Sequence, residues 1–547
     1  MIQGFSRQGN HNLSGMELLE EIHPLPSESG KGANLFQDLN QKLQQEFNME
    51  NMMLEEINFG PYLQPTQPFQ ETTGPKNQGA LTSSMHMPPS LASLELLRSY
   101  GSRFKMQNTS NLSKGKTCLA HQKMSTVEIV REAGARYVQY SSHWNDNFCI
   151  PMHPYGLKYL GNLSEEENGD VELVQFLLAA AERVSCQQFE RASRLLLHYQ
   201  WNSSSYASGN TVQRVVFHFA EALKERIDRE TGRITKGSEK NEEMELLQKM
   251  GGTNKSLLCH QKIPFNQVMQ FTGVQAMVEH VAGETKIHLI DLDIKCGVQC
   301  IALMQALAEC QNSMVKVKFF KISAIGLKAC KTKIEDTGKR LANFAESLNL
   351  TFSYKPVLVT DMAEFKEDHL EVEEDEAVVI YSPYFLRTMI SRPDCLENLM
   401  RIISNIKPSI MIVLEVEANH NSPSFVNRFI EAMFFYSAFL DCLYTCIEDD
   451  ECRVITEAIL SAGIRNIVAM EGRERTVRNV KIDVWRRFFA RYRMVEIGFS
   501  ESSMYQADLV AREFAIGKFC TVDKNGRSMI VGWKGTPMHS ISAWRFL

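Results

Sequence analysis

The stretch that decides the fold is Lys286-Ile-His-Leu-Ile-Asp-Leu-Asp-Ile-Lys-Cys-Gly-Val-Gln-Cys-Ile-Ala-Leu-Met-Gln-Ala-Leu-Ala-Glu309. An apolar run ends in an acidic turn with Asp291 and Asp293, and Gly297 then precedes a helical pattern of apolar residues. A strand, a tight turn and a helix in this order are typical of the first βα unit of a nucleotide-binding sheet. A phosphate-binding turn needs several glycines, which let backbone N–H groups approach the anion, but only one is present here. The stretch therefore predicts a nucleotide-binding type of sheet without its cofactor turn.

Strands and helices alternate from this stretch towards the C-terminus, which predicts an α/β core with a mostly parallel, doubly wound sheet. The predicted strands are Lys286–Asp291, Val315–Ile322, Leu350–Tyr354, Ala377–Tyr381, Ile410–Glu415 and Arg493–Ile497. The predicted helices are Ile301–Ala308, Thr332–Leu348, Cys395–Ile406 and Ser424–Phe439. Asn525-Gly526, between apolar segments 519–522 and 528–533, favours a hairpin, so an antiparallel edge should close the sheet.

Residues 125–280 are predicted to form an all-helical block. Ser125 and Glu128 fit a capping box before an apolar-periodic stretch. The leucine-rich helices that follow indicate a bundle core, with a partner-binding surface as the alternative, because about two heptads are too few for a coiled coil. The residues that carry both interpretations are Leu173, Leu177, Leu178, Val184, Leu195 and Leu196.

Residues 1–120 differ from the rest, because they are rich in Gln, Asn, Ser and Pro and their apolar residues fall in short islands. Such a segment cannot bury enough surface to fold alone, so we expect a disordered regulatory tail. The island at 35–54 mixes acids with Leu, Phe and Met, which suits folding on a partner. The predicted organisation is a tail over 1–120 and a folded region over 125–547, divided into helical residues 125–280 and an α/β core at 281–547.

Composition narrows the class of protein. The net charge of −6 gives no global signature of nucleic-acid binding, and the 13 cysteines contain no CxxC pair, which suits a reducing compartment. Cys296 and Cys300 lack partners at zinc-ligand spacing, so no metal site is predicted. With neither a signal pattern nor an apolar run of about 18 residues, we expect no membrane association and a location in the cytosol or nucleus.

The candidate chemistry lies beyond the carboxyl ends of the strands, where open α/β sheets bind ligands. Asp291 and Asp293 lie there, but the turn has only part of the pattern of a methyltransferase cofactor turn. No Gly-x-Ser-x-Gly nucleophile motif is present. The polar cluster Glu417–Asn421 is interpreted as loop structure that caps the next helix, with a functional site as the alternative. We therefore predict a non-enzyme without a cofactor, and keep a methyltransferase-like protein that binds S-adenosylmethionine or another small ligand as the alternative.

A basic stripe runs from Arg473 to Arg493. Because acids are interleaved and apolar residues give it an apolar face, the plainer interpretation is a core-facing helix with a basic solvent side. Contact with DNA phosphates is the sharper hypothesis. The candidate DNA-contacting residues are Arg473, Arg475, Arg478, Arg486 and Arg487.

In their order along the chain, these motifs resemble the plant GRAS-domain family of transcriptional regulators, over about residues 125–547. Ile287-His-Leu-Ile-Asp291 resembles the VHIID motif of that family, and Glu417-Ala-Asn-His-Asn-Ser-Pro-Ser-Phe425 resembles the block after its second leucine-rich region. The segment Asn466–Gly472 with Trp485 is similar to the RVER/PFYRE region. The chain ends as the SAW motif does, with Gly532-Trp-Lys-Gly535 and Ser542-Ala-Trp544.

The resemblance implies a helical cap on a Rossmann-like core related to methyltransferases, and a nuclear regulator that acts through protein–protein contacts. The implied partners are other GRAS proteins, in homo- or heterodimers, and DNA-binding transcription factors, with DNA itself as an alternative. Without an Asp-Glu-Leu-Leu-Ala stretch, the tail does not resemble that of DELLA members. The implied structural or interaction residues are His288, Asp291, Asp293, Gly297 and Gln299 in the VHIID-type motif, and Trp533, Ser542, Ala543 and Trp544 in the SAW-type motif.

Overall fold

The structure is a computed structural model that describes residues 93–100, 123–142, 163–200, 209–233, 262–294, 297–309, 317–514 and 517–547. Its centre is a nine-stranded sheet in the order β3-β2-β1-β4-β5-β9-β8-β7, with β6 paired to β9. The first five of these strands are parallel, and the pairs made by β9, β8, β7 and β6 are antiparallel. The strands are β1 Lys286–Asp291, β2 Phe319–Leu327, β3 Phe352–Val359, β4 Ala377–Pro383, β5 Ile410–Val416, β6 Met494–Ile497, β7 Cys520–Asn525, β8 Ser528–Trp533 and β9 Thr536–Phe546. The expected mostly parallel α/β class and the closing hairpin are confirmed.

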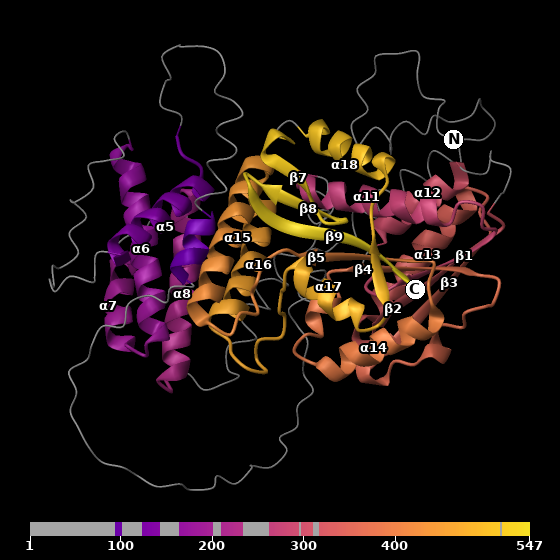
Figure 1. Cartoon of the computed structure of the whole chain (residues 1–547), viewed down its shortest axis with the longest axis horizontal. Helices are drawn as coiled ribbons and strands as arrows, with labels where there is room; N and C mark the ends of the chain where they lie inside the picture. The colour runs from indigo at the N-terminus through magenta and orange to yellow at the C-terminus, as the bar shows by residue number, and fades with distance from the viewer. Residues whose placement is uncertain are drawn as a thin grey trace, which may run out of the picture.

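Helices cover both faces of the sheet (Figure 1). One face packs against α11 Pro264–His280, α12 Val298–Glu309 and α13 Lys331–Ser347, and the other against α14 Pro393–Ile406 and α17 Ile482–Ala490. Successive side chains of β1 divide between the two, since Leu289 joins the first core cluster and Ile290 the second. Helix α18, Glu501–Glu513, packs on the outer side of α11.

The helical cap contains α5 Thr126–Ser142, α6 Glu165–Ser185, α7 Phe189–Gln200 and α8 Thr211–Glu230. Helices α15 Phe425–Cys446 and α16 Asp450–Val468 come from the core half of the sequence but pack against these cap helices, between them and the sheet (Figure 1). The expectation that α11 belongs to the helical block is wrong, because this helix lies on the sheet. Gly273 allows its close approach: a Cβ added there would lie 3.4 Å from Ile412 and Ile541.

Two further expectations are corrected. The helix predicted over Arg473–Arg493 begins only at Ile482, because the preceding side chains bond to loop backbone: Arg478 donates to the carbonyl of Gly472 at 2.6 Å. Residues 93–100, assigned to the tail, form a helix buried on one face. The remainder of the predicted tail, 1–92 and 101–120, lies outside the described residues.

One helix in the described part of the chain, α15, is long and apolar enough to cross a membrane by length and composition alone. Of its most apolar window, 83% is buried inside the protein. Helix α15 is therefore a core helix, and it joins the cap to the sheet.

Candidate functional site

The turn after β1 is closed by its own side chains. Asp291 is fully buried, and its carboxylate accepts the backbone N–H of Asp293 at 3.0 Å and the side-chain amide of Gln299 at 2.8 Å. The same Gln299 amide reaches the carbonyl of Ile294 at 3.3 Å. Three of the five predicted motif residues thus meet in one local hydrogen-bond network.

Gly297 lets this turn pack on the neighbouring helix. Its φ of +72° favours glycine, and an added Cβ would lie 3.1 Å from Thr337 and 3.2 Å from Leu341 of α13. The N–H of Gly297 donates to the carbonyl of Ile294 at 2.8 Å. Two backbone donors that could face a phosphate, those of Asp293 and Gly297, are therefore engaged inside the turn, which argues against the cofactor-binding alternative.

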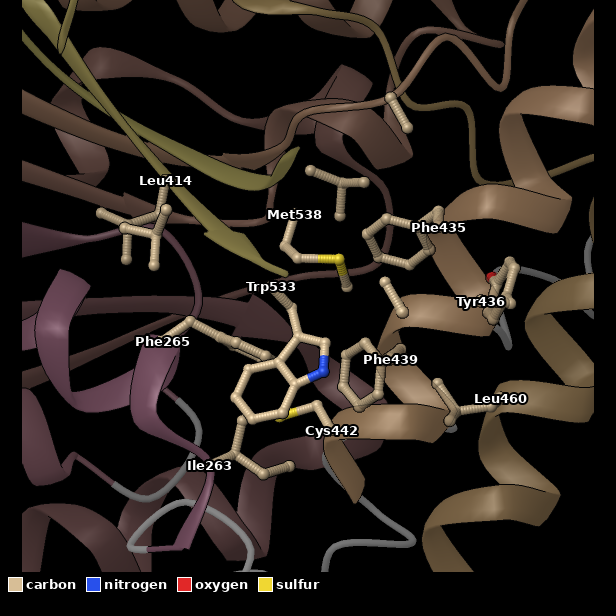
Figure 2. Close-up of a cluster of buried hydrophobic side chains, with 14 of the residues drawn as sticks. Ile263, Phe265, Leu414, Phe435, Tyr436, Phe439, Cys442, Leu460, Trp533 and Met538 are labelled. Atoms are coloured by element: carbon tan, nitrogen blue, oxygen red, sulfur yellow. The ribbon is translucent and has the colours of Figure 1, made fainter. Parts of the chain in front are cut away.

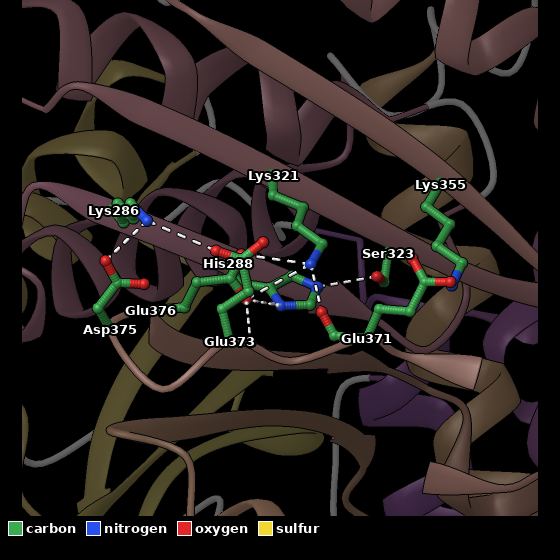
Figure 3. A network of polar contacts seen from close by, with 9 residues as sticks. All are labelled: Lys286, His288, Lys321, Ser323, Lys355, Glu371, Glu373, Asp375 and Glu376. Carbon is green, nitrogen blue, oxygen red and sulfur yellow. Dashed lines mark hydrogen bonds and ion pairs between the residues drawn. The ribbon is translucent and has the colours of Figure 1, made fainter. Parts of the chain in front are cut away.

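His288 lies on the other face of the sheet from Asp291, because successive residues of β1 point to opposite faces. Figure 3 shows its polar contacts. Its Nδ1 lies 2.8 Å from the carboxylate of Glu376 and its Nε2 lies 2.8 Å from the hydroxyl of Ser323. Lys321 contacts the same carboxylate at 3.2 Å. Burial lowers the pKa of His288 to about 4, so its imidazole is neutral at physiological pH and serves as a hydrogen-bonding group.

The His288 network holds an acidic segment against the ends of three strands. Lys286 on β1 pairs with Asp375 at 2.7 Å, and Lys355 on β3 pairs with Glu371 at 2.7 Å (Figure 3). Lys321, between them on β2, donates to the carbonyl of Glu371 at 2.5 Å. The sequence spacing carried a usable signal, because residues 288 and 291 are three apart and a strand places such residues on opposite faces.

The polar cluster after β5 is buried and bonded to the loop before α17. Glu417 accepts the N–H of Ile482 at 2.9 Å, and His420 bonds to the amide of Asn479 at 2.8 Å. Burial raises the pKa of Glu417 to about 7. The helix-capping role expected of this loop falls to Ser424, whose hydroxyl accepts the N–H of Asn427 at the start of α15.

The cap leucines form the interior of the helical bundle. Leu177, Leu178, Val184 and Leu196 are buried. Leu173 and Leu195 are partly buried and pack against the same core. The exposed apolar residue is their neighbour Leu197, at 50% exposure, which sequence reasoning missed although it follows Leu195 and Leu196 directly.

The candidate DNA-contacting arginines do not share one surface. Arg475 is buried and donates to the carbonyl of His420 at 3.0 Å, and Arg486 pairs with Glu496 at 3.0 Å. Arg478 is half-buried, and Arg473 and Arg487 are exposed. Two further arginines are exposed, Arg493 beside β6 and Arg545 on β9.

The C-terminal motif is a structural joint. Trp533 is fully buried among Phe265, Phe439 and Cys442, and its indole N–H donates to Asp441 of α15 at 2.7 Å (Figure 2). Trp544 donates to the hydroxyl of Ser542 at 2.8 Å, and Ala543 beside it is 1% exposed. All four predicted residues of this motif thus lie in the sheet interior.

A second joint links α8 of the cap to α15 and α16. The carboxylate of Glu457 lies 2.8 Å from His218, 3.2 Å from Arg214 and 2.6 Å from the hydroxyl of Tyr444. Burial opposes its ionisation, but the bonds from His218 and Tyr444 outweigh burial and lower the pKa of Glu457 to about 2. The cap is therefore bonded to the core through charged groups as well as apolar contacts.

A mostly parallel sheet with a closed first turn and a helical cap defines a Rossmann-like scaffold. The model of the GRAS domain family matches residues 173–545, and the chain belongs to this family. It is similar to DELLA protein GAIP of Cucurbita maxima, with 30% identity over 387 residues, which cover 70% of this chain and 64% of that protein. The match to DELLA protein RGL1 of Arabidopsis thaliana is 30% identical over 386 residues, covering 70% and 71%.

The crystal structure of SCL7 from Oryza sativa has the same fold, with a TM-score of 0.58 and 22% identity, and covers 68% of this chain and 99% of that one. The match spans slightly less than two thirds of the Cucurbita protein, so activity and partners do not transfer directly. At the level of the family, the chain belongs to a group of plant transcriptional regulators.

Proposed function

We propose that this protein regulates transcription in the nucleus by binding other regulators, including GRAS proteins and DNA-binding transcription factors. The observation that supports this most is the engagement of Asp291 by Asp293 and Gln299, which turns a cofactor position into a structural hub. Bonds from Trp533 and Glu457 fix the cap to that core. A cap that is fixed to the sheet, on a core whose first turn is closed by its own side chains, is suited to presenting surfaces to partners.

The outer face of the cap is the proposed contact surface. Helix α7 lies at the far side of the cap from the sheet (Figure 1). There Leu197 is 50% exposed, and Arg191 and Arg194 are exposed beside it. A central apolar side chain with flanking arginines is the composition expected of an interaction surface.

The test uses the full chain fused to a fluorescent protein and expressed in plant cells. We expect nuclear fluorescence, and we expect the fusion, tethered to a reporter promoter, to change transcription. L197D should reduce the reporter response, whereas the matched variant V454D, at an apolar position of α16 that is 46% exposed, should not. Exclusion from the nucleus, or an equal response from both variants, contradicts the proposal for this surface.

A second candidate function is direct contact with DNA, favoured by three exposed arginines on α17, beside β6 and on β9. In the described part of the chain, the side chains of Arg487, Arg493 and Arg545 are exposed and form no hydrogen bond or ion pair. Unpaired arginines are available for bidentate contacts with phosphates. These three arginines would replace the stripe that included Arg475 and Arg486.

DNA binding is tested by measuring affinity against salt concentration. The triple variant R487E/R493E/R545E should weaken binding and reduce the salt slope by about one for each phosphate that is no longer neutralised. R512E, at an exposed arginine of α18, is the control. Equal affinities for the triple variant and the unchanged protein would reject these arginines as DNA contacts.

A further inference from the structure

The helix formed by residues 93–100 covers a seat on α5 and α15. This short helix precedes residues 173–545, which match the family model. Its buried side is formed by Ser93, Leu94, Leu97 and Tyr100, with exposures of 2%, 9%, 2% and 5%. Its outer positions 95, 98 and 99 are exposed. The segment is therefore an amphipathic helix with a defined docking face.

The docking is anchored at both ends by side chains of α15. Tyr100 stacks on Phe434 with ring centroids 4.0 Å apart, and its hydroxyl donates to Glu431 at 2.7 Å. At the other end, the hydroxyl of Ser93 donates to Asn427 at 2.6 Å. Apolar contact thus lies between two polar anchors, a composition that fixes both the register and the direction of a docked helix.

A glycine forms the floor of the seat. A Cβ added at Gly134 of α5 would lie 3.2 Å from a methyl carbon of Leu97 and 3.8 Å from the ring of Phe434. Only the absence of a side chain at this position lets Leu97 approach so closely. We call the surface formed by Gly134, Asn427, Glu431 and Phe434 the α5–α15 seat.

The described helix lies at the periphery of the fold, because one side faces the α5–α15 seat and the outer positions 95, 98 and 99 are exposed. Opening of such a peripheral element costs less free energy than global unfolding. The seat would then present an aromatic ring, a glycine floor and the carboxylate of Glu431, which Lys481 holds at 2.6 Å from the other side.

We propose that the α5–α15 seat is a docking groove for an amphipathic helix of a partner protein, and that residues 93–100 compete with it from within the chain. The internal helix shows the chemistry that fits: leucine-sized side chains at positions i and i+3, and a hydroxyl donor at i+6 to meet Glu431. This groove is separate from the α7 surface and does not depend on it. Partner binding is thereby regulated by displacement of the chain's own helix.

The experiment uses the full chain and a fluorescent peptide with the sequence of residues 90–103. L97D weakens the internal helix and leaves the seat unchanged, so the peptide should bind this variant at least about tenfold more tightly than the unchanged protein. L97D/G134L fills the floor and should reverse the gain. A peptide with Tyr100→Phe, which lacks the donor to Glu431, should bind L97D several-fold more weakly.

Equal peptide affinity for L97D and L97D/G134L would overturn the proposal, provided both variants unfold cooperatively on heating. If L97D does not fold, hydrogen exchange on the unchanged protein gives the answer: excess peptide should accelerate exchange at residues 93–100 and not in α5. No acceleration overturns the proposal. A dimer of the unchanged protein that G134L abolishes would assign the seat to a second copy and overturn the choice of a separate partner.

Discussion

Two buried aspartates of this protein, Asp291 after β1 and Asp441 on α15, have similar surroundings and different reach. The carboxylate of Asp291 bonds to Asp293 and Gln299, and the thiol of Cys300 lies 4.0 Å from it, all on the turn and helix that follow β1. Asp441 joins three distant groups: the N–H of Thr126 at 3.1 Å, the indole of Trp533 at 2.7 Å and the ammonium group of Lys534 at 2.7 Å. The local network closes a turn, and the long-range network holds the cap on the sheet.

The largest predicted effect is therefore at the long-range network. Asp441→Ala leaves the Trp533 N–H and the Lys534 ammonium group without their acceptor, so we expect the free energy of unfolding to fall by about 3–5 kcal/mol. Because the lost bonds connect cap and core, unfolding in urea should also lose cooperativity, with α5–α8 melting first. Circular dichroism and tryptophan fluorescence, followed in the same titration, would then give different midpoints.

Asp441→Asn is the matched control. Its single side-chain oxygen can still accept the Trp533 N–H, but the ion pair with Lys534 is lost and an amide nitrogen replaces the oxygen that accepts the N–H of Thr126. We expect a loss of about 1–2 kcal/mol and coincident midpoints, because the ion pair and the bond from Thr126 are lost while the bond from Trp533 still joins the sheet to α15. Coincident transitions for Asp441→Ala would mean that the cap and core unfold together even without the bonds of Asp441. This result would contradict the role of Asp441 in holding the cap on the sheet.

The carboxyl group of Glu417, which accepts the N–H of Ile482, makes the free energy of unfolding depend on pH. Burial raises its pKa from 4.5 to about 7, so the folded state binds the proton more tightly than the unfolded chain does. Its stabilising effect is complete below pH 4.5 and is lost as pH rises through 7, by at most about 3 kcal/mol. Glu417→Gln keeps an acceptor for the N–H of Ile482 and should be more stable than the unchanged protein at about pH 8.

The measurement is the difference in unfolding free energy between about pH 5 and about pH 8, on either side of the folded-state pKa. We expect this difference to shrink in Glu417→Gln, since Gln cannot ionise. If the two proteins respond equally to pH over this interval, the carboxyl of Glu417 is not held neutral by its surroundings and the loop after β5 is more hydrated than its burial indicates.

The same contrast between local and long-range structure explains what the sequence could predict. Strands β1, β4 and β5 begin where expected, because a strand buried on both faces has a continuous apolar run. Strand β9 was missed, although it lies in the middle of the sheet. Its sequence includes Ser540 and Ser542, buried polar residues that disguise a central strand.

Local periodicity identifies an element but not the layer in which it lies. The pattern of α11 predicts a helix, and only the neighbouring sheet and α18 decide that this helix leaves the cap. The same limit applies to the site. The spacing of His288 and Asp291 along the strand could have predicted that they lie on opposite faces of the sheet. No local pattern distinguishes the buried Arg475 from the exposed Arg487, because their surroundings are set by residues far away in the sequence.

A smaller effect is expected at the turn after β1. Gly297→Ala forces an alanine to a φ of +72° and places its Cβ 3.1 Å from Thr337. We expect a loss of about 1–2 kcal/mol in the free energy of unfolding, with a single cooperative transition, because the strain is confined to the turn. Thr337→Ser removes the methyl group that the new Cβ would meet, and should restore part of the stability if the close approach contributes.

The smallest effect should come from Asp291→Asn. Asparagine retains one oxygen for the N–H of Asp293, and a flipped Gln299 amide can accept from the new side chain, so the loss should be about 1 kcal/mol. If the turn is only structural, the reporter response should survive Asp291→Asn, which removes the buried charge of the network. If Asp291→Asn retains its stability but abolishes the response, the turn contacts a ligand or partner directly. The network around Asp291 is then not purely structural.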